Sequence, residues 1–77
     1  MGYLRHTNFL KAFGENLRSI RLEKKLSQDE VAFRAEISTN QVGRIERGEL
    51  NTGLSTVYEI ATVLGISIHR LFDFEVK

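Results

Sequence analysis

Apolar residues in the first third of the chain recur at helical spacing. They stand three or four positions apart, with Leu10 beside them, and so fall on one side of a helix: Phe9, Phe13, Leu17 and Ile20. Asn8 is a suitable N-cap residue for such a helix. The apolar stripe fades at Lys24 and Lys25, two cations that suit the negative end of a helix dipole. The pattern predicts a first amphipathic helix between Asn8 and these lysines.

Two short helices are expected next, with almost no chain between them. Ser27 and Glu30 form the pattern of a capping box, and the following helix has its core positions at Val31, Ala32 and Ala35. The next start signal is Ser38, so only Glu36 and Ile37 separate the two helices. The third helix is expected from Thr39 to about Arg47, with Val42 and Ile45 buried. It ends at Gly48, which suits a left-handed C-terminal residue.

The remaining third of the chain predicts a loop over residues 49–53 and two further helices. The fourth helix carries one apolar face and ends at Gly65: Leu54, Val57, Ile60, Ala61 and Leu64. Ser67 caps a short fifth helix. The alternation of residues 72–76 fits either a short strand or a frayed end. The expected fold is all-α, a compact five-helix domain over residues 1–77.

Composition restricts the function classes. A chain of 77 residues makes one domain, and it contains no cysteine and no apolar run long enough to cross a membrane. With no signal-peptide stretch in residues 1–10, we expect a cytoplasmic protein. His6 and His69 are isolated, and no catalytic set or glycine-rich phosphate loop occurs, so we expect no metal, cofactor, small-molecule effector or enzymatic activity.

Charge is distributed unevenly along the chain although its net value is only +1. Residues 5–25 hold six basic and two acidic residues, and the rest of the chain holds five basic and eight acidic ones. Such an asymmetry orients a molecule on a polyanion, but it also fits the solvated face of an ordinary helix.

The segment 26–48, LSQDEVAFRAEISTNQVGRIERG, has the pattern of a helix-turn-helix, whose second helix fits the major groove of DNA. The two helices cross closely only if their inner face is small and apolar, as it is here: Ala32, Ile37, Val42 and Ile45. The outward positions of the second helix are polar or small: Thr39, Asn40, Gly43, Arg44 and Arg47.

The same segment resembles the phage repressor/Cro-like, or XRE-type, helix-turn-helix family. The resemblance lies in Leu-Ser-Gln at 26–28, the acidic pair at 29–30, Val-Ala at 31–32, Ile-Ser at 37–38 and Arg-Ile-Glu-Arg-Gly at 44–48. It continues through Asn51 and residues 65–67 and covers about residues 13–72. Residues 1–8 and 73–77 are then expected to be tails.

The resemblance implies sequence-specific binding of double-stranded DNA by a transcriptional regulator. Thr39, Asn40 and Arg44 match base-reading positions, and three further residues match phosphate contacts: Gln28, Gln41 and Arg47. These side chains suit those roles, because an amide pairs with adenine and a guanidinium with guanine or phosphate. Two positions depart from the family pattern: Glu36 replaces the usual turn glycine and Lys25 a frequent Gly or Asn. A non-glycine residue in the left-handed conformation costs on the order of 1 kcal/mol.

One recognition helix reads only a few base pairs, so we expect a homodimer on a palindromic operator, with recognition helices about 34 Å apart. We expect the dimer surface on the fourth helix, the short fifth helix and the tail. The candidate contacts are apolar residues whose alternative role is to close the monomer core: Ile68, Leu71, Phe72 and Phe74. The alternative function is a protein–protein interaction module, such as an antitoxin, with little or no DNA binding. The outward Asn40, Arg44 and Arg47 argue against it.

Overall fold

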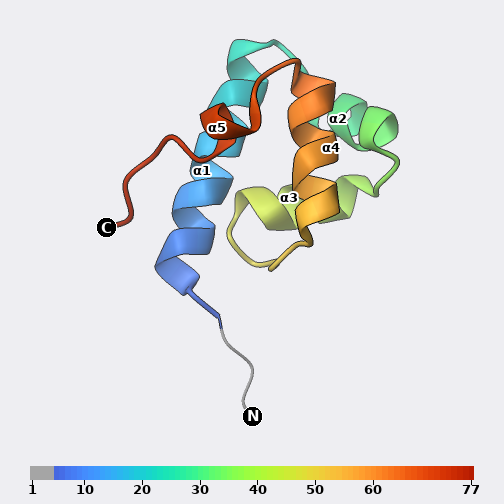
Figure 1. Ribbon diagram of the computed structural model, residues 1–77. Coiled ribbons are helices and arrows are strands. Elements are labelled where there is room, and N and C mark those ends of the chain that lie inside the picture. Colours follow the sequence, from blue (N-terminus) through green and yellow to red (C-terminus); the bar gives the residue numbers. More distant parts are fainter. Residues whose placement is uncertain (1–4) are drawn as a thin grey trace.

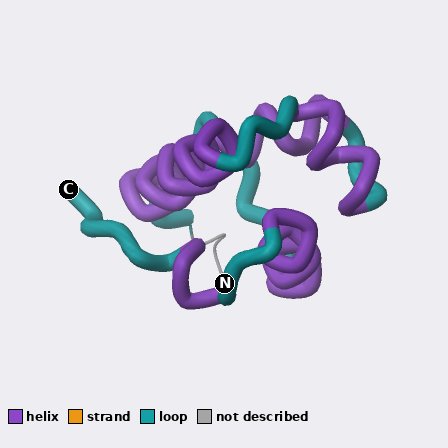
Figure 2. The backbone as a smooth tube through the Cα atoms, turned by 90° about the horizontal axis from the view of Figure 1, so that it is seen from above, coloured by secondary structure: helices purple, strands orange, loops and turns teal. Residues whose placement is uncertain are grey.

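The computed structural model describes residues 5–77 and contains five helices within them. In chain order they are α1 (Thr7–Glu23), α2 (Gln28–Ala35), α3 (Thr39–Glu46), α4 (Leu54–Leu64) and α5 (Ile68–Leu71) (Figure 1). Figure 2 shows that helices and loops alone make up this part of the chain. The expected all-α, five-helix fold is confirmed. None of these helices is long and apolar enough to span a lipid bilayer.

All five helices contribute to one core. α2 and α3 pack against each other, α3 also packs against α1 and α2 against α4, while α5 contacts both α1 and α4. The core consists of thirteen buried side chains: Phe13, Leu17, Ile20, Val31, Ala32, Ala35, Val42, Ile45, Val57, Ile60, Ala61, Leu64 and Leu71. Two residues of the predicted apolar stripes lie outside it, because Phe9 is 37% exposed and Leu54 is 83% exposed.

Serine side chains cap three of the helix N-termini. The capping box at α2 is present as predicted, with Ser27 Oγ 3.0 Å from the Glu30 backbone nitrogen and Glu30 Oε1 2.9 Å from that of Ser27. Ser38 and Ser67 cap α3 and α5 through their side chains alone, which accept hydrogen bonds from the backbone nitrogens of Gln41 and Arg70. The expectation for Asn8 is wrong. The first helical hydrogen bond runs from the Leu10 nitrogen to the His6 carbonyl, so α1 begins earlier, at Thr7.

Four helices end in a residue with the left-handed backbone conformation. Gly48 and Gly65 adopt it at φ 74° and 68°, but Lys25 and Glu36 also adopt it, at φ 59° and 57°. Each end carries the two backbone hydrogen bonds of a Schellman motif. In the turn after α2, Glu36 donates to the Phe33 carbonyl and Ile37 to the Ala32 carbonyl. The helix-turn-helix turn therefore keeps its usual geometry despite the strain at Glu36.

The C-terminal segment packs on α1 through aromatic rings rather than forming a strand. Phe74 is half-buried, and its ring centroid lies 5.6 Å from that of Phe9; the Phe72 centroid lies 5.2 Å from that of Phe13. The expected tail at residues 73–77 is thus partly packed. Of the expected tail at 1–8, residues 1–4 lie outside the described chain, and α1 already includes residues 7 and 8.

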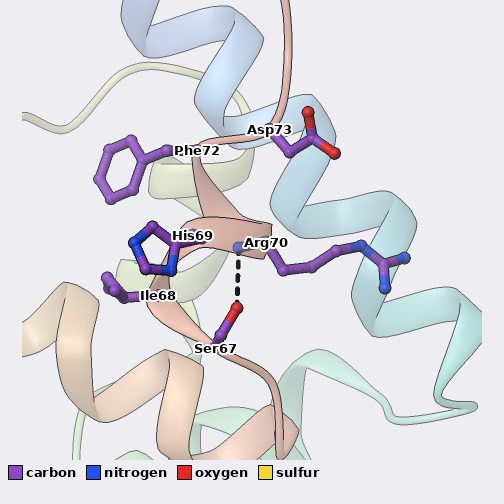
Figure 3. A pocket seen from close by; sticks show the side chains of 6 residues that line it. All are labelled: Ser67, Ile68, His69, Arg70, Phe72 and Asp73. Atoms are coloured by element: carbon purple, nitrogen blue, oxygen red, sulfur yellow. Dashed lines mark hydrogen bonds between the residues drawn. The ribbon is translucent and has the colours of Figure 1, made fainter.

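Polar contacts hold α5 against α1. Asn16 Nδ2 donates to the carbonyl oxygens of Arg70 and Leu71, each at 2.9 Å, and so satisfies the C-terminal end of α5. The Arg70 guanidinium lies 2.9 Å from the Glu23 carboxylate. Figure 3 shows Arg70 directed toward α1, while Phe72 and His69 lie on the other side of α5.

Candidate nucleic-acid interface

Helix α3 has two faces of opposite character. Val42 and Ile45 are completely or almost completely buried against the other helices, whereas Thr39, Asn40 and Arg44 are exposed. Ser38 fixes the start of α3 and the Schellman motif at Gly48 fixes its end. The core therefore holds the helix in place by its inner side and leaves the outer side open to a partner.

The three predicted base-reading residues lie on this outer side. Thr39 Oγ1 donates to Asp29 Oδ1 of α2 at 2.7 Å, which restrains its hydroxyl in the unbound protein. The side chains of Asn40 and Arg44 make no hydrogen bond or ion pair within residues 5–77. Their donors and acceptors are thus available to a ligand, but their role in reading bases remains a prediction.

The predicted phosphate-contact residues fall into two places. Gln28 and Arg47 lie together over Gly43, where an added Cβ would stand 3.1 Å from Arg47 Nη1 and 3.6 Å from Gln28 Oε1. Gln41 lies apart from them in the first turn of α3, half-buried. Gln28 is the first residue of α2, and its Nε2 donates to Glu46 Oε1 of α3 at 2.9 Å. That contact supports the bracing role implied for Gln28, while its phosphate contact stays a prediction.

A buried ion pair fixes α3 to α1. Arg21 Nε lies 2.6 Å and its Nη2 3.1 Å from the two carboxylate oxygens of Glu46, and the two side chains are only 8% and 2% exposed. Arg21 Nη1 also donates to the Leu26 carbonyl at 2.9 Å. Every buried polar side-chain atom within residues 5–77 has a hydrogen-bond partner. The partner of Glu46 lies 25 residues away along the chain, so the helical pattern does not predict this pair.

A second ion pair lies on the surface just beyond α3. Arg47 Nε and Nη2 stand 3.0 Å and 3.3 Å from the two Glu49 carboxylate oxygens. The hydrogen bonds between them raise the pKa of Arg47 above its ordinary value and lower the pKa of the Glu49 carboxyl. The phosphate-contact candidate Arg47 is thus occupied by a carboxylate in the unbound protein, which the sequence did not predict.

The candidate dimer residues divide by their exposure. Phe72 is 40% exposed, and Ile68 and Phe74 are half-buried, so all three present some surface. Leu71 is completely buried and belongs to the monomer core, so its candidacy as a contact residue is corrected. Ile68 and Phe72 border an open hollow of about 520 Å³ beside α5 (Figure 3).

The sequence predicts the fourth helix as part of the dimer surface, but it does not single out two exposed apolar residues of α4. Leu54 is 83% exposed and Tyr58, one helical turn later, is 66% exposed. Leu54 lines a second hollow, of about 150 Å³, together with Phe9 and Phe72. The helical pattern placed Leu54 on the core-facing side, because position 54 is one turn before the buried Val57 and two turns before the buried Ala61. As the first residue of α4, however, it lies beyond the edge of the core.

These features define a small helix-turn-helix protein whose second helix presents an open polar face. The helix-turn-helix family model matches residues 17–71, and the chain belongs to this family. It is the repressor/Cro-like, XRE-type family of DNA-binding regulators that the sequence resembles.

Among its relatives is the control protein C.BamHI of Bacillus amyloliquefaciens, 35% identical over 68 residues, which cover 87% of this chain and 84% of the relative. The immunity repressor protein of Bacillus phage phi105 is 38% identical over 62 residues, or 80% of this chain and 43% of that protein. The crystal structure of the restriction-modification controller protein C.AhdI from Aeromonas hydrophila is 37% identical, with a TM-score of 0.80 over 87% of this chain and 100% of that chain. None of these names describes an enzyme.

Proposed function

We propose that the protein is a transcriptional regulator that binds a specific double-stranded DNA sequence with α3 in the major groove. The observation that carries this proposal is the outer face of α3, where Asn40 and Arg44 are exposed without intramolecular side-chain partners in the described chain. An amide and a guanidinium are the groups that pair with adenine and guanine at the groove edge. The relatives named as control and repressor proteins support it.

The length of α3 limits what one protomer reads. Its eight residues extend over about 12 Å, which corresponds to three or four base pairs. So short a site is frequent in any genome, and a second protomer in the next major groove on the same face of the duplex supplies the missing selectivity. We therefore propose a two-fold homodimer on a palindromic operator, which regulates by occupying a promoter or a site beside it.

Exposed apolar residues of α4 and of the C-cap of α5 provide the proposed dimer surface. Leu54, Tyr58 and Phe72 are all large and at least 40% exposed, and the hollow that Leu54 borders also contains Phe9 and Phe72. A two-fold axis through this surface brings Leu54 of each protomer to the hollow of its partner. α5 contacts both α1 and α4, so this surface is attached firmly to the rest of the fold.

Selection of bound duplexes from a random pool tests the DNA-binding proposal. We expect a palindromic motif whose half-sites are separated by about one helical turn. Arg44→Ala is expected to lose about 1–3 kcal/mol on the selected site and to relax the preference at one base position. Gln28→Ala is expected to weaken all duplexes more evenly. No enrichment over the starting pool, or unchanged base preference in Arg44→Ala, would contradict the proposal.

Sedimentation of the purified protein tests the dimer. We expect a dimer at micromolar concentration, and Leu54→Asp is expected to convert it to a monomer because it places a charge in the apolar contact. Phe33→Asp is the matched control, since Phe33 is 85% exposed on α2, outside the proposed surface. A monomer at all concentrations, with and without DNA, would refute the dimer. Equal effects of the two variants would refute its placement.

A further inference from the structure

The chain reverses direction at the end of α3, so that Glu49 lies beside the last turn of this helix. Gly48 takes the left-handed conformation, and the Glu49 nitrogen donates to the Arg44 carbonyl at 2.9 Å. This backbone bond fixes where the Glu49 side chain starts. Its carboxylate then receives two hydrogen bonds from Arg47. The carboxylate is thus placed by the fold and not only by the attraction of the arginine.

An arginine from the opposite end of the sequence reaches the same place. Arg5 precedes α1, and its Nη2 donates to the Gly48 carbonyl, the residue next to Glu49, at 3.2 Å. The pKa of the Glu49 carboxyl is lowered first by the hydrogen bonds of Arg47 and further by the positive charges of Arg44 and Arg5. Two guanidinium groups, which we call the arginine cluster (Arg5 and Arg47), therefore lie at this carboxylate and its neighbouring carbonyl, and the positive charge of Arg44 adds to theirs.

The arginine cluster has the composition of a phosphate site. A guanidinium fork binds a carboxylate and a phosphate with the same pair of parallel hydrogen bonds. Together with the charge of Arg44, the cluster leaves a net positive charge around the single carboxylate of Glu49. The Arg47–Glu49 pair is also open to solvent, with side chains 56% and 51% exposed, and exposed pairs of this kind are weak enough to be exchanged.

We propose that the arginine cluster binds a backbone phosphate of DNA at the C-terminal end of α3, and that Glu49 holds Arg47 in the unbound protein and is displaced by that phosphate. The inference rests on the proposed DNA binding and extends it to Arg5 and Glu49, which the sequence did not assign to the interface. It also gives a role to Arg5, one of the six basic residues in 5–25. Lys11 of that segment lies against Gly48, since a Cβ added there would stand 2.7 Å from the Lys11 Cα.

Removal of the Glu49 charge tests the exchange. Binding is measured by fluorescence anisotropy on a random-sequence duplex of about 20 base pairs at about 50 mM salt, because phosphate contacts do not depend on sequence. We expect Glu49→Gln to bind about two- to fivefold more tightly than wild type, the range associated with one exposed ion pair. In an Arg47→Ala background the same change is expected to have a much smaller effect.

Glu36→Gln is the matched control for this charge change. It removes one exposed carboxylate beside the other end of α3, where none of the observed ion pairs or side-chain hydrogen bonds involves Glu36. If the loss of any negative charge strengthens DNA binding, Glu36→Gln should raise the affinity by the same factor in wild type and in Arg47→Ala. If Glu49→Gln also raises the affinity by the same factor in both backgrounds, the proposed exchange is wrong.

Substitution of Arg5 tests its place in the arginine cluster. We expect Arg5→Ala to weaken binding and to reduce the slope of log affinity against log salt by about 1, as for the loss of one phosphate contact. Arg5→Lys keeps the charge and should keep the slope. Lys24→Ala removes a cation at the C-cap of α1, at the other end of that helix from Arg5, and should change neither quantity (Figure 1).

The outcomes separate this inference from the function on which it rests. If wild-type protein binds no duplex, both the DNA-binding proposal and the inference fail. If wild type binds and Glu49→Gln binds no more tightly, only the exchange fails. If Arg5→Ala matches Lys24→Ala, Arg5 is not part of the phosphate site. Circular dichroism spectra that match wild type establish that each variant is folded.

Discussion

Glu36 in the turn between α2 and α3 offers a direct test of backbone strain. Its φ of 57° and ψ of 42° place a residue with a Cβ in the left-handed conformation, at a cost of roughly 1–2 kcal/mol. Glycine avoids this cost but loses about 0.4–1 kcal/mol more backbone entropy on folding. Glu36→Gly is therefore expected to raise the free energy of unfolding by about 0.5–1 kcal/mol. For a domain of this size, that corresponds to a rise in Tm of about 2–8 °C.

Thermal unfolding followed by circular dichroism measures this effect, and two further variants isolate its cause. Glu36→Gln removes the charge near the start of α3 but keeps the backbone strain. The difference in Tm between Glu36→Gly and Glu36→Gln therefore measures the effect of the strain. Gly65→Ala is the reverse change, because Gly65 has φ 68° and an added Cβ would meet no atom within 4 Å. It should lower the stability by a similar amount. The reasoning is refuted if Gly65→Ala destabilises while Gly and Gln at position 36 have the same Tm.

Three further predictions concern the contacts that hold α3 and α2 in place. Gly14→Ala should lower the free energy of unfolding by about 1–3 kcal/mol, because the new Cβ would overlap the last carbonyl groups of α3. Helix propensity alone predicts the opposite, a gain of about 1 kcal/mol. Urea unfolding of the variant and of wild type decides between the two. Arg21→Met should cost about 3–5 kcal/mol by leaving the Glu46 charge buried and unpaired, and the double variant Arg21→Met/Glu46→Leu should recover most of that loss in the same assay. The pKa of Glu30 is lowered chiefly by the hydrogen bond from the Ser27 backbone nitrogen, so its stabilising effect is present above the ordinary carboxyl pKa and is lost as the pH falls through the lowered value. Glu30→Gln should therefore show a smaller fall in Tm between neutral and acidic pH than wild type, and equal falls would contradict this.

Local signals in the sequence predicted most of the helices. Ser27, Ser38 and Ser67 marked three helix starts correctly, and Gly48 and Gly65 marked two ends. These predictions succeeded because a cap depends on residues within one helical turn. Where no side chain capped the helix, as at the start of α1, the choice of Asn8 failed.

Contacts between distant segments could not be predicted in the same way. The pairing of Arg21 with Glu46 and the approach of Arg5 to Gly48 join residues 25 and 43 positions apart. Periodicity also cannot tell where a core ends along a helix axis, so Leu54 was placed inward although it lies exposed at the first position of α4. In the candidate interface, the family pattern supplied the residue roles, while Glu49 became visible only from the geometry.

The separation of the two faces of α3 has a consequence for how the sequence of such a protein evolves. The side chains that hold the helix, Val42, Ile45 and Glu46, point into the domain, while Asn40 and Arg44 contribute little to its folding. Substitutions at exposed positions without partners usually alter stability by less than about 0.5 kcal/mol. The outer positions are therefore free to diverge between descendants. With the function proposed for α3, a lineage would acquire a new target sequence without first having to rebuild its scaffold.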